Sequence, residues 1–213
     1  MQNTKVLEML ISNRIDELKQ LLRDEIYADI LKSKPGAKKR YAAMKKYFSY
    51  TNLEREYLKK PCLIEYENEN YTSFCNSFSV ALTKEPCGVI ELYTDTDQYP
   101  SVDRLIRKEG SASRIDFTKV FAEAKSKGYK LVKSEINSYK FSFLLRYKNS
   151  YFKLGLFDAT FSIIDDGEPA TVYISDDERS PITVETSIGV CTVMPMNLGE
   201  GAYTIIVAED VIE

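Results

Sequence analysis

The side chains most capable of chemistry in this sequence are carboxylates, which gather in two short acidic runs at 165–168 and 176–178. Carboxylate oxygens are the ligands that Mg²⁺ and Ca²⁺ prefer, so either run could in principle hold a divalent cation. Their spacing matches no calcium-binding loop, and the neighbouring glycine and prolines are typical of solvated turns between strands. We therefore interpret both runs as turns and expect no metal ion and no other cofactor.

Histidine is absent from the sequence. It is the usual general base near neutral pH and the commonest metal ligand, so its absence excludes Ser-His-Asp catalysis, Cys-His catalysis and His-containing zinc sites. The phosphate-binding patterns G-x-x-x-x-G-K-[ST] and G-x-G-x-x-G are also missing. We therefore predict that the protein acts by binding and is not an enzyme.

A basic segment lies between residues 31 and 50, although the net charge of the whole chain is −3. It contains no acidic residue, and its positive side chains are Lys32, Lys34, Lys38, Lys39, Arg40, Lys45 and Lys46. Tyrosine and phenylalanine alternate with these charges, a mixture typical of a surface that contacts phosphates and stacks on exposed bases. The alternative is an amphipathic helix whose Tyr41, Met44 and Phe48 face the core. Both interpretations hold if the aromatic rings are buried while the lysines face a partner.

Length and composition predict a folded protein, because 213 residues of which 44% are hydrophobic can bury one substantial core or two small ones. We expect a cytoplasmic protein without a membrane segment, since no apolar run reaches eighteen residues and residues 1–17 alternate apolar with charged side chains. The cysteines at positions 62, 75, 87 and 191 are widely spaced, and we expect reduced, mostly buried thiols.

The apolar pattern changes from helical to strand-like near residue 60. A helical stripe runs from Leu7 to Leu22 and is expected to be buried against a sheet. A second helix is predicted after Gly36 towards Lys59, where Pro61 ends it. Short runs rich in β-branched and aromatic residues follow, at 62–66, 71–74, 77–82 and 89–93. They predict an antiparallel meander.

The second half of the chain repeats this order of helix followed by strands. Asp116 is expected to cap a helix that Gly128 ends, with one apolar stripe at Phe117, Val120, Phe121 and Ala124. The other face of this helix carries Lys119, Lys125 and Lys127. Beyond it we predict a hairpin over 139–156, a short helix at 157–164 and strands at 170–175, 182–185, 190–194 and 203–207.

Several motifs together resemble one family. Residues 190–198, VCTVMPMNL, resemble the closing strand of bacterial DNA polymerase III β subunits, the sliding clamps, which typically end in a V-M-P-M-R-L-like sequence. Residues 152–164 are similar to the clamp segment F-x-x-x-Y-L-L-D-A-L, and 170–181 to the strand and Ser-Pro turn that follow it. Residues 99–106 resemble the F-P-D-Y-x-R-x-I/L-P segment that joins two clamp domains. The resemblance covers roughly residues 98–198, with Asn197 in place of the usual arginine.

The resemblance implies an α+β, DNA clamp-like fold in which helices pack on one side of curved antiparallel sheets in two lobes. The lobes would be 1–97, helical and then stranded, and 98–198, the clamp-like part, followed by a tail at 199–213. Clamp helices contact phosphates without reading bases, so the lysines of the Asp116 helix and the basic segment are expected to contact duplex DNA. Met194, Pro195 and Met196 would line the groove that takes polymerase peptides in clamps. The alternative is that these three are ordinary edge-strand residues.

We therefore expect a reduced, phage-type clamp-like protein that assists replication by sequence-independent contact with duplex DNA. Its partners would be DNA and replication proteins that enter the peptide groove. A chain of this length would have to form a homo-oligomer to encircle DNA. The alternative function is a clamp-fold protein-interaction module that does not bind DNA.

Overall fold

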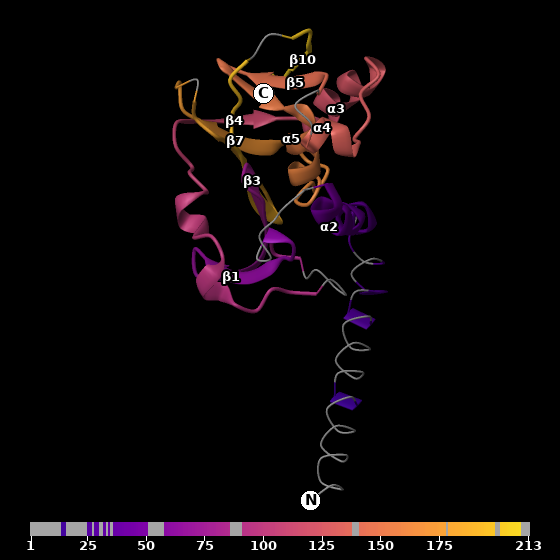
Figure 1. Ribbon diagram of the computed structural model, residues 1–213, viewed down its shortest axis with the longest axis vertical. Coiled ribbons are helices and arrows are strands. Elements are labelled where there is room, and N and C mark those ends of the chain that lie inside the picture. The colour runs from indigo at the N-terminus through magenta and orange to yellow at the C-terminus, as the bar shows by residue number, and fades with distance from the viewer. Residues whose placement is uncertain are drawn as a thin grey trace, which may run out of the picture.

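The computed structural model is an α+β protein in which two sheets and a group of helices pack together (Figure 1). It describes residues 14–15, 25–26, 28–29, 32, 34, 36–50, 58–85, 91–137, 141–177, 179–198 and 201–209. The α-helices whose bounds are described are α2 (Ala37–Tyr50), α3 (Phe117–Ser126), α4 (Lys133–Asn137) and α5 (Leu154–Phe161), and the described 3₁₀ turns are η2 (Thr96–Gln98) and η3 (Val102–Arg104). The strands are β1 (Cys62–Tyr66), β2 (Glu69–Cys75), β3 (Ser79–Thr83), β4 (Ser111–Ile115), β5 (Phe143–Tyr147), β6 (Ser150–Lys153), β7 (Ala170–Ile174), β8 (Ile182–Thr186), β9 (Gly189–Val193) and β10 (Thr204–Val207).

The larger sheet has the strand order β1-β2-β3-β9-β8-β7-β4, and every neighbouring pair in it is antiparallel. Strands β1–β3 follow α2 along the chain, and β7–β9 follow α5. The two units, each a helix followed by three strands, therefore meet where β3 pairs with β9, with Ala81 opposite Cys191. The meeting is close, because a Cβ atom at Gly189 would lie 2.2 Å from the carbonyl oxygen of Leu82. One continuous sheet thus crosses the predicted boundary between residues 97 and 98.

The smaller sheet has the order β10-β5-β6 and contains a parallel pair. Strands β5 and β6 form the predicted hairpin around Lys148, whose φ of 51° closes the turn. Strand β10, from the predicted tail, runs parallel to β5, so the prediction of purely antiparallel sheets is wrong here. The long connection from β6 back to β10 allows this direction, since parallel neighbours need a crossover where antiparallel ones need only a turn.

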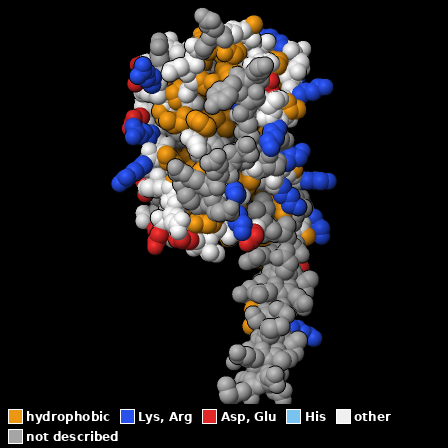
Figure 2. Space-filling model, viewed as in Figure 1, with side chains coloured by type: hydrophobic (Ala, Val, Ile, Leu, Met, Phe, Trp, Pro, Cys, Tyr) orange, Lys and Arg blue, Asp and Glu red, His pale blue; other side chains and the backbone are white. Residues whose placement is uncertain are grey.

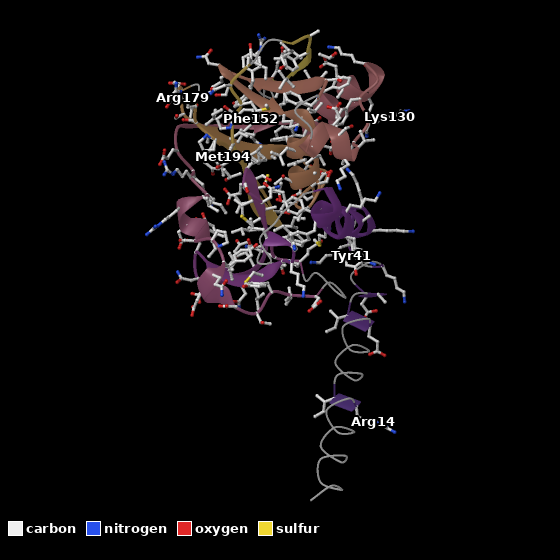
Figure 3. The ribbon with its side chains drawn as sticks, viewed as in Figure 1. Arg14, Tyr41, Lys130, Phe152, Arg179 and Met194 are labelled. Carbon is white, nitrogen blue, oxygen red and sulfur yellow. The ribbon has the colours of Figure 1, made fainter. Side chains whose placement is uncertain are left out.

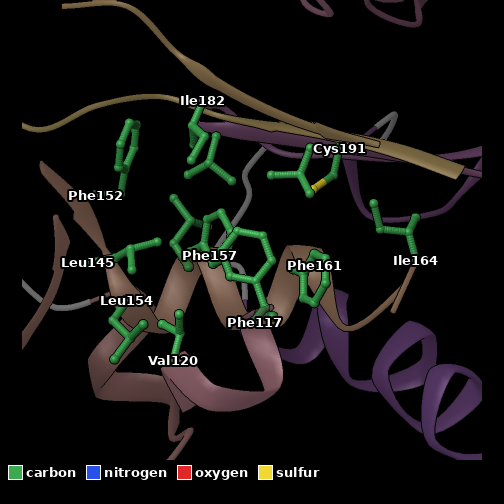
Figure 4. Packing of buried hydrophobic residues seen from close by; sticks show 14 of the residues in the cluster. Phe117, Val120, Leu145, Phe152, Leu154, Phe157, Phe161, Ile164, Ile182 and Cys191 are labelled. Carbon is green, nitrogen blue, oxygen red and sulfur yellow. The ribbon is translucent and has the colours of Figure 1, made fainter. Parts of the chain in front are cut away.

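The two faces of the larger sheet bury different cores. One face packs against the α-helices, with the rings of Phe117, Phe157 and Phe161 beneath Ile182 and Cys191 (Figure 4). The Phe117 ring lies 4.9 Å from the Phe157 ring and 4.7 Å from the Phe161 ring, between centroids. The opposite face carries a second core that includes Leu82 and Val190 and is covered by Leu58 and the segment around η3. The described α-helices therefore pack on one side of the larger sheet.

Local signals located most elements correctly. Asp116 caps α3 by accepting a hydrogen bond from the Thr118 amide at 3.0 Å, and Phe117, Val120 and Ala124 are buried as predicted. Gly128 follows the helix with φ of 92°. Cysteines 62, 75 and 191 are buried and unpaired, while Cys87 lies outside the described residues.

Two predicted segments differ from the structure or fall mostly outside it. Of the Leu7 to Leu22 stripe, only Ile15 is described, and it is helical but 46% exposed, so burial against a sheet is wrong for this residue. The predicted strand at 89–93 is wrong for its described residues 91–93, which make only an isolated parallel bridge from Tyr93 to Cys62. Residues 86–90 lie outside the described part.

Candidate nucleic-acid interface

Helix α2 separates its rings from its charges. Tyr41, Met44 and Tyr47 are buried against the main core, and Phe48 packs partly buried beside them. Lys38, Lys39, Lys45 and Lys46 are exposed on the remaining surface, and Lys32 and Lys34 are exposed before the helix begins. The amphipathic interpretation is therefore confirmed, because the side chains at helical spacing face the core. The lysine side chains lie at the surface, where an outside partner can reach them.

Arg40 is not part of this exposed surface, so its assignment as a DNA-contacting residue is wrong. Its side chain is 2% exposed and that of Glu85 is 4% exposed. The guanidinium donates twice to the carboxylate, from Nε at 2.9 Å and from Nη2 at 2.6 Å, and Nη1 donates to the Asp165 carbonyl at 3.1 Å. A buried carboxylate requires such a partner, since burying an unpaired charge is strongly unfavourable. Arg40 therefore joins α2 to the end of β3 and to the loop after α5.

Helix α3 places its three predicted lysines in solvent. The side chain of Lys119 is 81% exposed, and its ammonium group lies 3.6 Å from Asp116. Lys127 pairs with Glu123 at 2.6 Å, and Lys125 is exposed beside them. Surface ion pairs of this kind are weak, so these lysines can still exchange their carboxylate for a phosphate.

One partly buried carboxyl group on α5 interacts with charges from both α2 and α3. Asp158 of α5 accepts hydrogen bonds from the Tyr129 hydroxyl at 2.9 Å and from the Ser162 hydroxyl at 3.0 Å. Lys125 of α3 and Lys39 of α2 both lie close enough to act on its charge. On the face in view, basic side chains project along the right-hand edge of the molecule, where Figure 1 places α2, α3 and α4 (Figure 2). We call the exposed lysines of α2 and α3 together with Lys130 and Lys133 the basic face.

A cleft opens on the basic face between α2 and α5, with a volume of about 240 Å³. Lys39, Ala42, Ala43, Lys46, Leu131, Ala159 and Ser162 line it. This cleft was not predicted, because its floor consists of small side chains from two helices.

Three charged members of this region were not predicted from the sequence. Lys130 and Lys133 are exposed on either side of Leu131, and Lys130 points outward in Figure 3. Both follow Gly128, where the helical period that marked Lys119 and Lys125 ends. Asp158 was not singled out because most of its neighbours in α5 are apolar, so the pattern there predicts only a short helix. The interaction of its charge with those of Lys39 and Lys125 depends on tertiary structure alone.

No family model, curated protein or solved structure matches this chain.

The acidic runs lie in turns, as the sequence predicted. Asp165 pairs with Lys39 at 2.6 Å, and Asp166 accepts hydrogen bonds from the amide and hydroxyl of Ser187 at 3.0 and 2.7 Å. Asp177 accepts from the Arg179 amide at 3.0 Å. Within the described ranges, no three Asp, Glu, Cys or His side chains gather in a way that could hold a metal ion. None of the described helices has the length and apolar character needed to cross a membrane.

The Met194 to Met196 segment continues from β9 towards the smaller sheet. The Met194 amide donates to the Phe78 carbonyl at 2.9 Å, and the Met196 amide donates to the Tyr151 carbonyl at 2.8 Å. Met194 is 45% exposed and Phe78 64% exposed, while Pro195 and Met196 are half-buried. Hydrophobic side chains gather in the upper half of the surface in Figure 2, and Figure 3 labels Met194 in that area. Phe78 was not predicted, since it lies in a turn rather than in the matching motif.

The carboxyl group of Asp158 makes the basic face sensitive to pH. Burial raises its pKa above the ordinary value of 3.8, although hydrogen bonds from Tyr129 and Ser162 and the charges of Lys125 and Lys39 oppose the shift. The folded protein therefore binds this proton more tightly than the unfolded chain, and the carboxyl group lowers stability as pH rises from 3.8 through the raised pKa.

Replacing Asp158 by asparagine should remove this dependence. Denaturant unfolding at several pH values should show a stability gain for Asp158→Asn that is smallest below the ordinary aspartate pKa and grows with pH. Loss of one negative charge that interacts with Lys39 and Lys125 should also strengthen binding of duplex DNA. A variant less stable than the unmodified protein at every pH would show instead that the hydrogen bonds to the carboxylate outweigh its desolvation.

Proposed function

We propose that this protein is a non-catalytic, sliding clamp-like DNA-binding protein whose basic face contacts the phosphates of duplex DNA. The observation that carries the proposal is that α2 and α3, far apart in sequence but packed on the same core, both turn their apolar side chains inward and expose their lysines. DNA carries a negative phosphate at every nucleotide, so it binds best to a surface that presents several lysine or arginine side chains. Because the net charge of the whole chain is −3, exposed lysines on one surface are not explained by an excess of basic residues in the chain.

The contact should be independent of DNA sequence. The rings of Tyr41 and Tyr47 are buried in the core, so α2 presents lysine side chains and few groups that could stack on bases. An ammonium group is a compact point charge that contacts phosphate oxygens without reading the pattern of a base edge. Duplex DNA, whose bases are stacked inside, is therefore a better ligand for this face than a single strand.

The arrangement of helices and sheets supports the clamp-like part of the proposal. In a clamp, helices face the DNA and the sheets lie behind them. The described α-helices pack on one side of the larger sheet, and two helix-then-three-strand units join through antiparallel strands β3 and β9. We assign these units to the two lobes of the proposal. Encircling a duplex would require several copies joined through exposed sheet edges.

A salt titration of duplex binding tests this function. The logarithm of the association constant should fall linearly with the logarithm of salt concentration, by about 0.9 for each phosphate contact. Two duplexes of equal length and different sequence should give the same affinity and the same slope. Fluorescence anisotropy at low salt would measure both quantities. Absence of duplex binding at low salt would leave the protein-interaction function as the better one.

A second function, binding of a peptide beside Met194, Pro195 and Met196, is favoured by one observation. Phe78 is held next to Met194 by a backbone hydrogen bond, and both side chains are largely exposed. Exposed aromatic and methionine side chains at a sheet end can accept apolar residues of a partner. Changing Met194 and Met196 to serine should leave duplex binding unaltered, so this pair of substitutions is also the control for the salt titration.

A further inference from the structure

The cleft between α2 and α5 has an apolar floor and a charged rim. Its floor and wall consist of Ala42, Ala43, Ala159 and Leu131. Space remains because alanine side chains reach only one carbon from each helix. The hydroxyl of Ser162, which also lines the cleft, donates to the Asp158 carboxyl group at 3.0 Å. The cleft therefore offers an apolar surface with little capacity to hydrogen-bond a ligand inside it.

Two lysines form the rim. Lys39 and Lys46 are seven residues apart on α2, which places them on the same side of the helix and roughly 10 Å apart along its axis. The ammonium group of Lys39 pairs with Asp165, but its side chain is 68% exposed, so the pair is weak and exchangeable. An apolar cleft with a cation on either side matches a chain in which an apolar side chain lies between acidic ones.

We propose that this cleft anchors one bulky apolar side chain of an acidic peptide segment, whose flanking carboxylates pair with Lys39 and Lys46. The acidic segment and duplex DNA would use the same lysines and exclude each other from the basic face. The proposal rests on the proposed DNA contact only for this competition. The peptide docking itself is a separate binding activity, and it uses a different surface from the one around Met194.

A nucleic-acid base fits the cleft less well than an aliphatic or aromatic side chain of a peptide. Base recognition depends on stacking against rings and on hydrogen bonds to the base edges. Among the described residues that line the cleft there is no aromatic ring, and the hydroxyl of Ser162 already donates to Asp158. Burial of an apolar group requires neither feature, only the removal of its surface from water.

The test compares two capped hexapeptides of equal charge on the full chain, with the sequences DELFDE and DESSDE. Isothermal titration should show the Leu-Phe peptide binding at least about tenfold more tightly, because one apolar side chain is buried. Ala42→Leu fills the cleft from an exposed position of α2 and should remove this difference. Ala122→Leu makes the same change at an exposed position of α3 outside the cleft and should preserve it.

Equal affinity of the two peptides for the unmodified protein would overturn the proposal, as would full retention of the difference in Ala42→Leu. Loss of oligothymidylate binding in Ala42→Leu, with peptide binding intact, would assign the cleft to a base instead. Measuring the affinity of the same proteins for duplex DNA distinguishes failure of the peptide proposal from failure of the proposed DNA-binding function. Ala42→Leu should bind duplex normally, and a failure of the unmodified protein to bind duplex would remove the DNA function while leaving the peptide result standing.

Discussion

Replacing Arg40 by methionine should lower the free energy of unfolding by about 3–5 kcal/mol, because it leaves a buried carboxylate without its partner. Glu85 is 4% exposed and receives two hydrogen bonds from the guanidinium. Methionine fills a similar volume, so the loss reports mainly the uncompensated charge and the broken hydrogen bonds. Denaturant unfolding at neutral pH measures the change.

The double variant Arg40→Met, Glu85→Gln is the control for this result. Neutralising the remaining partner should restore a large part of the lost stability, since the penalty arises from an isolated buried charge. At temperatures where Arg40→Met is still folded, its affinity for duplex DNA should equal that of the unmodified protein, because Arg40 does not reach the surface. A stability change below about 1 kcal/mol would contradict the burial of this ion pair. A large loss of DNA affinity in the folded variant would instead return Arg40 to the interface.

Changing Lys39, Lys46 and Lys125 together to glutamine should weaken duplex binding by roughly a hundredfold at low salt, as each removed charge is worth about 1 kcal/mol. The salt slope should fall by about three units, one for each lost phosphate contact. Glutamine keeps most of the side-chain length, and all three positions are exposed, so the fold should be unaffected. The three lysines come from both helices of the basic face, which makes the result a test of their joint action.

A matched triple variant removes the same charge elsewhere. Lys60, Lys84 and Lys148 lie outside the basic face and pair with Glu91, Glu69 and Asp176. Their change to glutamine should leave the salt slope unchanged, and any loss of affinity should be a few-fold at most. Equal losses in the two triple variants would mean that DNA responds only to net charge, and the assignment to the basic face would be wrong.

The elements that the sequence located well are those with local signals. For α3, a cap, an apolar stripe and a terminal glycine lie within a dozen residues and agree with one another. The hairpin of β5 and β6 likewise depends on one short turn. The pairing of β3 with β9 has no local signal, because it is specified by the shape of two completed units. The parallel direction of β10 could not be predicted for the same reason.

The charges of the candidate site were visible in the sequence, but their surroundings were not. Arg40 stood in a run of lysines and was grouped with them, since its partner Glu85 is 45 residues away. The approach of Lys39 and Lys125 to Asp158 requires α2, α3 and α5 to pack together. The cleft depends on alanines from two helices, and an alanine in a helical pattern signals nothing by itself. The exposed charges could therefore be predicted from the sequence, and their arrangement in space could not.

The pairing of β3 with β9 also sets the order in which the chain can fold as it is synthesised. Ala81 and its partner Cys191 are about 110 residues apart, so their contact closes a very long loop and must form late. At a translation rate of roughly 5–20 residues per second, the first three strands wait several seconds or longer for β9 to leave the ribosome. During that time β3 has an open hydrogen-bonding edge, and its side chains, all buried in the complete structure, lack part of their cover. The middle of the sheet is thus completed last, and nascent chains are open to pairing with a foreign strand until it closes.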